Sequence, residues 1–223
     1  MDPFHQRLAM IGLTAADRYG FALAGGYAVQ AAGLIGRPSE DVDLFTAWDR
    51  RSDFDTAVDA VAAAYRADGL AVDLERRYDT FARLRVSNGD QTSKVELAVD
   101  WRANDPIQMA VGAVLHPDDA VANKMGALYG RALARDFMDV DAAVRSGRYS
   151  WDALLGLAAR ADAGFDRQVF AVALAQADAL DADDFAEYGM SDLELEGLRA
   201  RFAAWRASLL DAAQDGPRRN VDT

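Results

Sequence analysis

The spacing of apolar residues changes near residue 117, and this change constrains the fold of the 223-residue chain more than any other feature. Before that point, short apolar or alternating runs predict strands at 21–24, 41–45, 70–77, 80–87 and 93–101. Helical spacing in the same part predicts helices at 4–19, 27–34 and 53–68. Beyond it, the spacing predicts only helices, at 118–133, 136–145, 151–163, 166–178 and 192–213. We therefore expect an α+β fold, with a mixed β-sheet flanked by helices in domain 1–110 and an all-helical domain at 111–223.

Composition excludes several classes of protein. The 36 acidic residues outnumber the 24 basic ones, and the net charge of -12 argues against a general nucleic-acid coat but allows a local basic groove. The chain has no cysteine, which excludes disulfides, Cys-bound zinc, iron–sulfur clusters and thiol nucleophiles. No apolar run approaches the roughly 18 residues of a membrane span, and the first residues do not form a signal peptide. We therefore expect a cytoplasmic protein with no membrane partner.

Two carboxylates lie close together in the predicted strand at 41–45. Side chains alternate along a strand, so Asp41 and Asp43 share one face while Val42 points to the other. Two like charges this close favour a divalent cation between them, and Mg²⁺ binds such a carboxylate pair together with substrate phosphates. The alternative is a solvated edge strand, which the apolar neighbours make less attractive. Gly25-Gly26 precedes this strand at a strand–helix turn, where bare backbone lets a phosphate approach, although two glycines there are also typical of a simple tight turn.

A charged stripe follows in the helical part. Along a single helix from Asn123 to about Arg145, one face roughly 80° wide carries Lys124, Arg131, Arg135 and Asp139. The alternative interpretation is a row of surface ion pairs that contributes little stability. Lysine is rare in this chain, since 22 of the 24 basic residues are arginine, and Lys94 and Lys124 are the two exceptions.

Together these features resemble a known family. FALAGGYAV at 21–29 with GRPSEDVDLF at 36–45 resembles the first motif of the AbiEii/AbiGii toxin-type nucleotidyltransferases, within the DNA polymerase β-like nucleotidyltransferase superfamily. ANKMGALYGRALARDFMD at 122–139 resembles that family's helical motif, a lysine followed by R-x-x-x-R-D-x-x-D. The two motifs occur in the expected order over residues 20–145.

The resemblance implies a minimal nucleotidyltransferase fold and a set of site residues. Asp41 and Asp43 would hold Mg²⁺, with Glu96 as the third acid and Asp100 as the second choice on the same strand face. Gly25 and Gly26 would close on a nucleoside triphosphate, and Ser39 would contact a phosphate or only form the turn. In the helical motif, Lys124 would lie against the triphosphate. The remaining motif residues would contact the nucleotide (Arg131 and Arg135) or orient Lys124 or the acceptor (Asp139).

The acceptor is open at this point. The resemblance implies a toxin of a type IV-like toxin–antitoxin system, with a cognate antitoxin and with a tRNA 3′ end as one acceptor. A groove for RNA would be lined by Arg76, Arg77, Arg83 and Arg85, although Arg83 and Arg85 on one strand face fit a solvated sheet face equally well. One alternative is an aminoglycoside-type antibiotic nucleotidyltransferase, for which the carboxylates at 181, 183, 184 and 187 would receive a polycationic acceptor. Another is a catalytically silent nucleotide-binding module.

Overall fold

The structure is a computed structural model that describes residues 1–37 and 39–214, with side chains described up to residue 211. Backbone contacts divide the chain into two compact units, Met1–Ala120 and Val121–Thr223, and we describe each by itself. The domain boundary expected at residue 110 stays a prediction.

The first unit contains a seven-stranded mixed sheet with the strand order β3-β4-β5-β2-β1-β7-β6. β2 runs parallel to β5 and β1 runs parallel to β7, while every other neighbouring pair is antiparallel. The strands are β1 (Ala22–Leu23), β2 (Asp41–Ala47), β3 (Ala71–Tyr78), β4 (Phe81–Ser87), β5 (Thr92–Asp100), β6 (Ile107–Met109) and β7 (Gly112–Val114).

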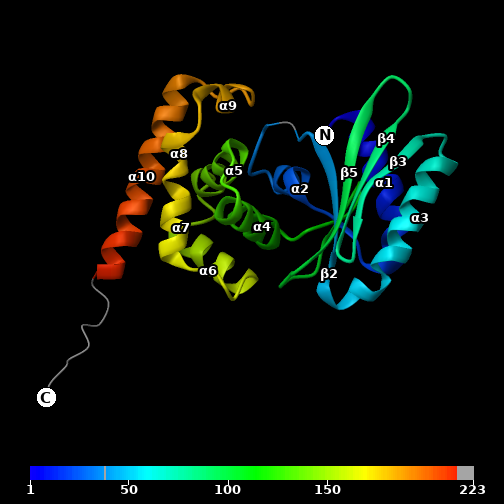
Figure 1. The fold of residues 1–223 in the computed structure, drawn as a ribbon, viewed down its shortest axis with the longest axis horizontal. Coiled ribbons are helices and arrows are strands. Elements are labelled where there is room, and N and C mark those ends of the chain that lie inside the picture. Colours follow the sequence, from blue (N-terminus) through cyan, green and yellow to red (C-terminus); the bar gives the residue numbers. More distant parts are fainter. Residues whose placement is uncertain (38, 215–223) are drawn as a thin grey trace, which may run out of the picture. The chain divides into compact units, whose positions relative to one another are not determined.

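Two long helices, α1 (Pro3–Ala16) and α3 (Phe54–Ala67), pack on one face of this sheet, and the short α2 (Gly25–Ala31) lies on the other side (Figure 1). The 3₁₀ turns η1 (Asp17–Tyr19) and η2 (Trp48–Asp53) join helices to strands. Val42, Leu44 and Leu97 point toward α1 and α3 and are fully buried, so this side forms the core of the unit. We call the opposite side of the sheet, which bears Asp41 and Asp43, the carboxylate face.

From residue 117 to residue 214, all the regular elements are helices. The helices are α4 (Pro117–Gly130), α5 (Ala134–Arg145), α6 (Trp151–Ala161), α7 (Arg167–Leu174), α8 (Gln176–Ala179), α9 (Ala182–Ala186) and α10 (Asp192–Gln214). Phe137, Phe170, Phe202 and Trp205 form a buried aromatic cluster where α5, α7 and α10 meet. The expected fold class is therefore confirmed: a mixed sheet flanked by helices, followed by a helical part.

The structure corrects three expectations. The separate helices predicted at 118–133 and 136–145 are confirmed as α4 and α5, but the single helix expected from Asn123 to about Arg145 is wrong, because α4 ends at Gly130 and α5 begins at Ala134. Between them Ala132 has a left-handed backbone with φ of 49°, which no continuous helix contains. The helix expected at 166–178 is divided into α7 and α8, and the strands β6 and β7 and the helix α9 were not predicted. Strands of three residues are too short to show an alternating pattern.

Candidate active site

Three carboxylates meet on the carboxylate face of the sheet. Asp41 and Asp43 lie on β2, and the parallel register with β5 places Glu96 beside Asp43. One carboxylate oxygen from each of the three lies within 4.8 Å of the other two, and all three residues are half-buried. Within residues 1–37 and 39–214, no other group of three acidic or histidine side chains lies this close together. We call this group the acid cluster.

The strand register distinguishes the two candidates for the third acid. Asp100 pairs with Ala47, four residues beyond the position of Asp43 on β2. At about 3.3 Å per residue, this is about 13 Å along the strand. Glu96 is therefore the acid that joins Asp41 and Asp43, and Asp100 lies outside the cluster. Carboxylate oxygens are the ligands that Mg²⁺ prefers, so the residues present fit this ion.

The two glycines of the first motif are required by close packing. Gly25 has a left-handed backbone with φ of 58°, and a Cβ added there would lie 1.7 Å from Oδ2 of Asp43. A Cβ added at Gly26 would lie 2.7 Å from the Ser39 Oγ. The Ser39 hydroxyl itself donates to the backbone carbonyl of Asp41 at 3.3 Å. The start of α2 thus presents bare backbone directly against the acid cluster.

An arginine that sequence reasoning did not assign to the site borders the acid cluster. Arg83 on β4 is paired across the antiparallel ladder with Glu96 on β5. Its Nε and Nη2 both contact the Oε1 atom of Glu96, at 2.8 and 2.5 Å. The sequence placed Arg83 only in a possible RNA groove, because its neighbour across the ladder depends on the length of the β4–β5 turn.

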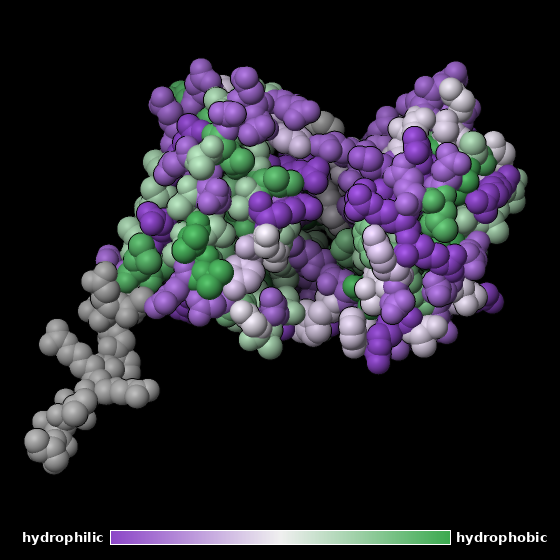
Figure 2. Space-filling view, in the orientation of Figure 1, coloured by the Kyte–Doolittle hydropathy of each residue, from purple (hydrophilic) through white to green (hydrophobic). Residues whose placement is uncertain are grey.

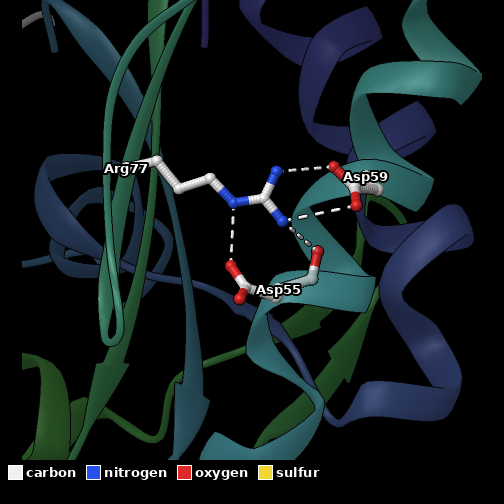
Figure 3. Close-up of polar contacts among 3 residues, drawn as sticks. All are labelled: Asp55, Asp59 and Arg77. Carbon is white, nitrogen blue, oxygen red and sulfur yellow. Dashed lines mark hydrogen bonds and ion pairs between the residues drawn. The ribbon is translucent and has the colours of Figure 1, made fainter.

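One of the four arginines expected in the RNA groove does not lie on the carboxylate face. Arg77 lies on the opposite side of β3 and points to α3, where its guanidinium contacts Asp55 and Asp59 (Figure 3). These hydrogen bonds raise the pKa of Arg77 further above its ordinary range. Arg77 therefore ties β3 to α3 and is not part of the carboxylate face.

A second group of site candidates lies in the helical unit. Lys124 on α4 contacts Asp139 on α5, with 2.9 Å between Nζ and Oδ2. The side chain of Asp139 is fully buried and that of Lys124 is 11% exposed, so this pair is not part of a surface stripe. Arg131 contacts both carboxylate oxygens of the buried Asp136, each at 2.9 Å. Arg135, in the first turn of α5, is half-buried.

A histidine links three elements of the first unit. His5 on α1 lies 2.6 Å from the Tyr27 hydroxyl on α2 through Nδ1, and 2.9 Å from the Ser93 hydroxyl on β5 through Nε2. The Ser93 hydroxyl donates to the Lys94 carbonyl, so it accepts from Nε2–H. In the neutral imidazole, Nδ1 then accepts from the Tyr27 hydroxyl. Partial burial lowers the pKa of His5 below its ordinary 6.5, against the raising effect of Asp2 and Asp41.

Hydrophilic residues cover most of the visible surface, with apolar residues scattered among them (Figure 2). In the part of the chain that the structure describes, no helix has both the length and the apolar content to span a bilayer.

Comparison with known proteins identifies the family. A family model described as nucleotidyl transferase AbiEii toxin, type IV toxin–antitoxin system, matches residues 10–222. The chain belongs to the AbiEii family. It is a nucleotidyltransferase of the toxin type, as the resemblance of its two motifs implied. Membership implies a nucleotide substrate and a cognate antitoxin.

Solved structures share the fold of this AbiEii protein. JHP933 from Helicobacter pylori superposes with a TM-score of 0.55 at 17% identity, covering 95% of this chain and 94% of that one. MenT4, a nucleotidyltransferase toxin from Mycobacterium tuberculosis, gives a TM-score of 0.52 at 17% identity, covering 93% of this chain and 83% of that one. A search of curated protein sequences finds no significant match.

Proposed function

We propose that this AbiEii protein uses Mg²⁺ to transfer a nucleoside monophosphate from a nucleoside triphosphate to an acceptor hydroxyl, and that the acceptor is a tRNA 3′ end. The observation that supports this proposal most strongly is the acid cluster, in which three carboxylates converge within 4.8 Å beside bare glycine backbone. Arg83 offsets part of this charge through Glu96, and a divalent cation held by all three carboxylates would relieve the repulsion among them.

In this proposal Asp41, Asp43 and Glu96 hold the metal, which when bound neutralises charge on the phosphates and activates the acceptor oxygen. Gly25 and Gly26 admit the triphosphate, and the Ser39 hydroxyl shapes the turn beside it. The acceptor oxygen forms a bond to the α-phosphorus while the bond from that phosphorus to the bridging oxygen breaks. Pyrophosphate leaves, and Glu96 receives the proton of the acceptor hydroxyl.

The helical motif completes the proposal. Lys124 provides positive charge to the triphosphate as pyrophosphate leaves, which a compact ammonium does well. Asp139, whose carboxylate contacts the Lys124 ammonium, orients that side chain. Arg131 and Arg135 contact the nucleotide. We place the reaction in the cytoplasm, where nucleoside triphosphates and tRNA are present.

The test is transfer of label from each of the four α-³²P-labelled ribonucleoside triphosphates, with Mg²⁺, to total RNA and to the protein itself. We expect label on a tRNA-sized band from the unmodified protein and none from Asp43→Ala. Asp90→Ala, at the exposed β4–β5 turn, is the matched control and keeps transfer. Label on no macromolecule, under conditions in which nucleotide binds, would instead support an antibiotic-type small-molecule acceptor or a silent binding module.

A further inference from the structure

The strand registers arrange the side chains around the acid cluster in two rows. One row crosses β4, β5 and β2 through Arg83, Glu96 and Asp43. The next row crosses the same strands through Arg85, Lys94 and Asp41. Both rows lie on the carboxylate face, so a cationic border on β4 runs alongside the acids of β5 and β2.

Of the two arginines on this border, one contacts the acid cluster and the other does not. Arg83 directs Nε and Nη2 to a single oxygen, Oε1 of Glu96, and its side chain is 25% exposed. Arg85 contacts Glu75 on β3 at 2.8 Å, and its side chain is 54% exposed. The two arginines are two residues apart on one strand and point the same way, which makes Arg85 a natural control for Arg83.

A glutamate carboxylate needs a contact like that of Arg83 to stay in one position more than an aspartate carboxylate does. Glu96 has one more rotatable bond than Asp41 and Asp43, and it is repelled by both of them. Without a restraint, its carboxylate would turn away from β2. The two N–H groups of Arg83 occupy Oε1 and leave Oε2 available for another interaction.

We propose that Arg83 is a positioning residue, which holds Glu96 through Oε1 so that its other carboxylate oxygen serves as a ligand of the divalent cation bound with Asp41 and Asp43. The proposal rests on the metal site of the proposed function and adds to it a residue of β4. Groups that orient a metal ligand typically contribute 10–100-fold to metal affinity.

The experiment measures Mn²⁺ binding directly, from the free Mn²⁺ signal in electron paramagnetic resonance, with the full-length protein and a non-hydrolysable nucleoside triphosphate. We expect Arg83→Gln to weaken Mn²⁺ binding by roughly 10-fold. Arg85→Gln should bind Mn²⁺ within about twofold of the unmodified protein, because Arg85 does not contact a ligand. In the background of Glu96→Gln, Arg83→Gln should have no further effect, since its partner carboxylate is already gone.

Two results would overturn the proposal. One is Mn²⁺ binding by Arg83→Gln that equals or exceeds that of the unmodified protein. The other is an undiminished effect of Arg83→Gln in the Glu96→Gln background, which would mean that Arg83 acts on the nucleotide. If Arg83→Gln does not fold, Arg83→Lys replaces it, and full Mn²⁺ affinity in that variant counts against a two-donor contact. Asp43→Asn distinguishes a failure of this proposal from a failure of the proposed function. If Asp43→Asn also leaves Mn²⁺ binding unchanged, the metal site of the proposed function is wrong, and not only the role of Arg83.

Discussion

At the scale of single residues, the position of the Asp43 carboxylate depends on the missing side chain of Gly25. Alanine at this position would have to tolerate a left-handed backbone and a Cβ 1.7 Å from Oδ2 of Asp43. We expect Gly25→Ala to lower transfer at least about 100-fold, because a displaced carboxylate no longer meets the substrate correctly. We also expect a loss of about 2 kcal/mol in the free energy of unfolding.

The matched control for this prediction is Gly36→Ala. An added Cβ at Gly36 meets no atom within 4 Å, so this variant should keep both transfer and stability. Nucleotide transfer and urea unfolding measure the two effects separately. Full transfer by Gly25→Ala would show that the close approach to Asp43 has no part in the reaction.

Single residues also show how much of the candidate site the sequence alone predicts. Strand alternation predicts that Asp41 and Asp43 share a face, and it predicts the same for Glu96 and Asp100, but it does not choose between the last two. That choice depends on the register of β2 with β5, two strands far apart in the chain. The contact of Arg83 with Glu96 depends in turn on the β4–β5 turn: Ser87 pairs with Thr92, whereas a two-residue Asn-Gly turn would bring Arg83 opposite Lys94.

At the scale of elements, His5 couples stability to pH by linking α1, α2 and β5. Its pKa is lowered in the folded protein, so the unfolded chain binds the proton more tightly. The stability that neutral His5 contributes is therefore present above about pH 6.5 and is lost as pH falls through the lowered pKa of the folded state.

We expect the free energy of unfolding to fall more steeply between pH 7 and pH 5 in the unmodified protein than in His5→Asn, which cannot titrate. Urea unfolding of both proteins at several pH values measures the difference, and the shared titration of the carboxylates cancels. Parallel pH profiles would mean that the imidazole is as easily protonated in the fold as in the unfolded chain.

The turn between α4 and α5 shows where periodicity misleads. On a continuous helix, one face would carry Lys124, Arg131, Arg135 and Asp139. The helix is instead interrupted at residues 131–133, and Lys124 still contacts Asp139. Asp136 holds this break: it is fully buried, accepts from Arg131 twice, and accepts from the backbone N–H of Leu133 at 3.2 Å. Contacts of one buried carboxylate thus stabilise an interruption where the charged stripe indicated a continuous helix.

Asp136→Ala should therefore lower the free energy of unfolding by about 2 kcal/mol, because it removes charge-assisted hydrogen bonds and leaves the Leu133 N–H without its acceptor. Asp152, an exposed acid in the first turn of α6, provides the comparison, and Asp152→Ala should stay within about 0.5 kcal/mol. Thermal and urea unfolding measure both. Equal stabilities of the two variants would assign the break to Gly130 and Ala132 alone.

At the scale of the whole molecule, a net charge of -12 means that RNA has to be attracted locally. Several arginines are already engaged with acids, among them Arg7 with Asp68 and Arg201 with Asp141. Among the described residues of the carboxylate face, three exposed cations lie near the acid cluster: Arg76, Lys94 and Arg85, whose contact with Glu75 an RNA phosphate would replace. This count sets the strength of the electrostatic contribution to RNA binding.

If the acceptor is tRNA bound over these three cations, its binding should weaken as the salt concentration rises. A plot of the logarithm of the binding constant against the logarithm of salt concentration should have a slope of about -2, because each phosphate contact of a single strand contributes about 0.7. Replacing Arg85 and Lys94 together by glutamine should reduce the slope to about -0.7, because one contact is left. Arg7→Gln removes the same kind of charge from α1, on the other face of the sheet, and should leave the slope unchanged. Filter binding of tRNA over a range of KCl concentrations gives all three slopes. A protein that binds no tRNA at the lowest salt concentration, while still binding nucleotide, would rule out this face as an RNA site and would favour a small-molecule acceptor.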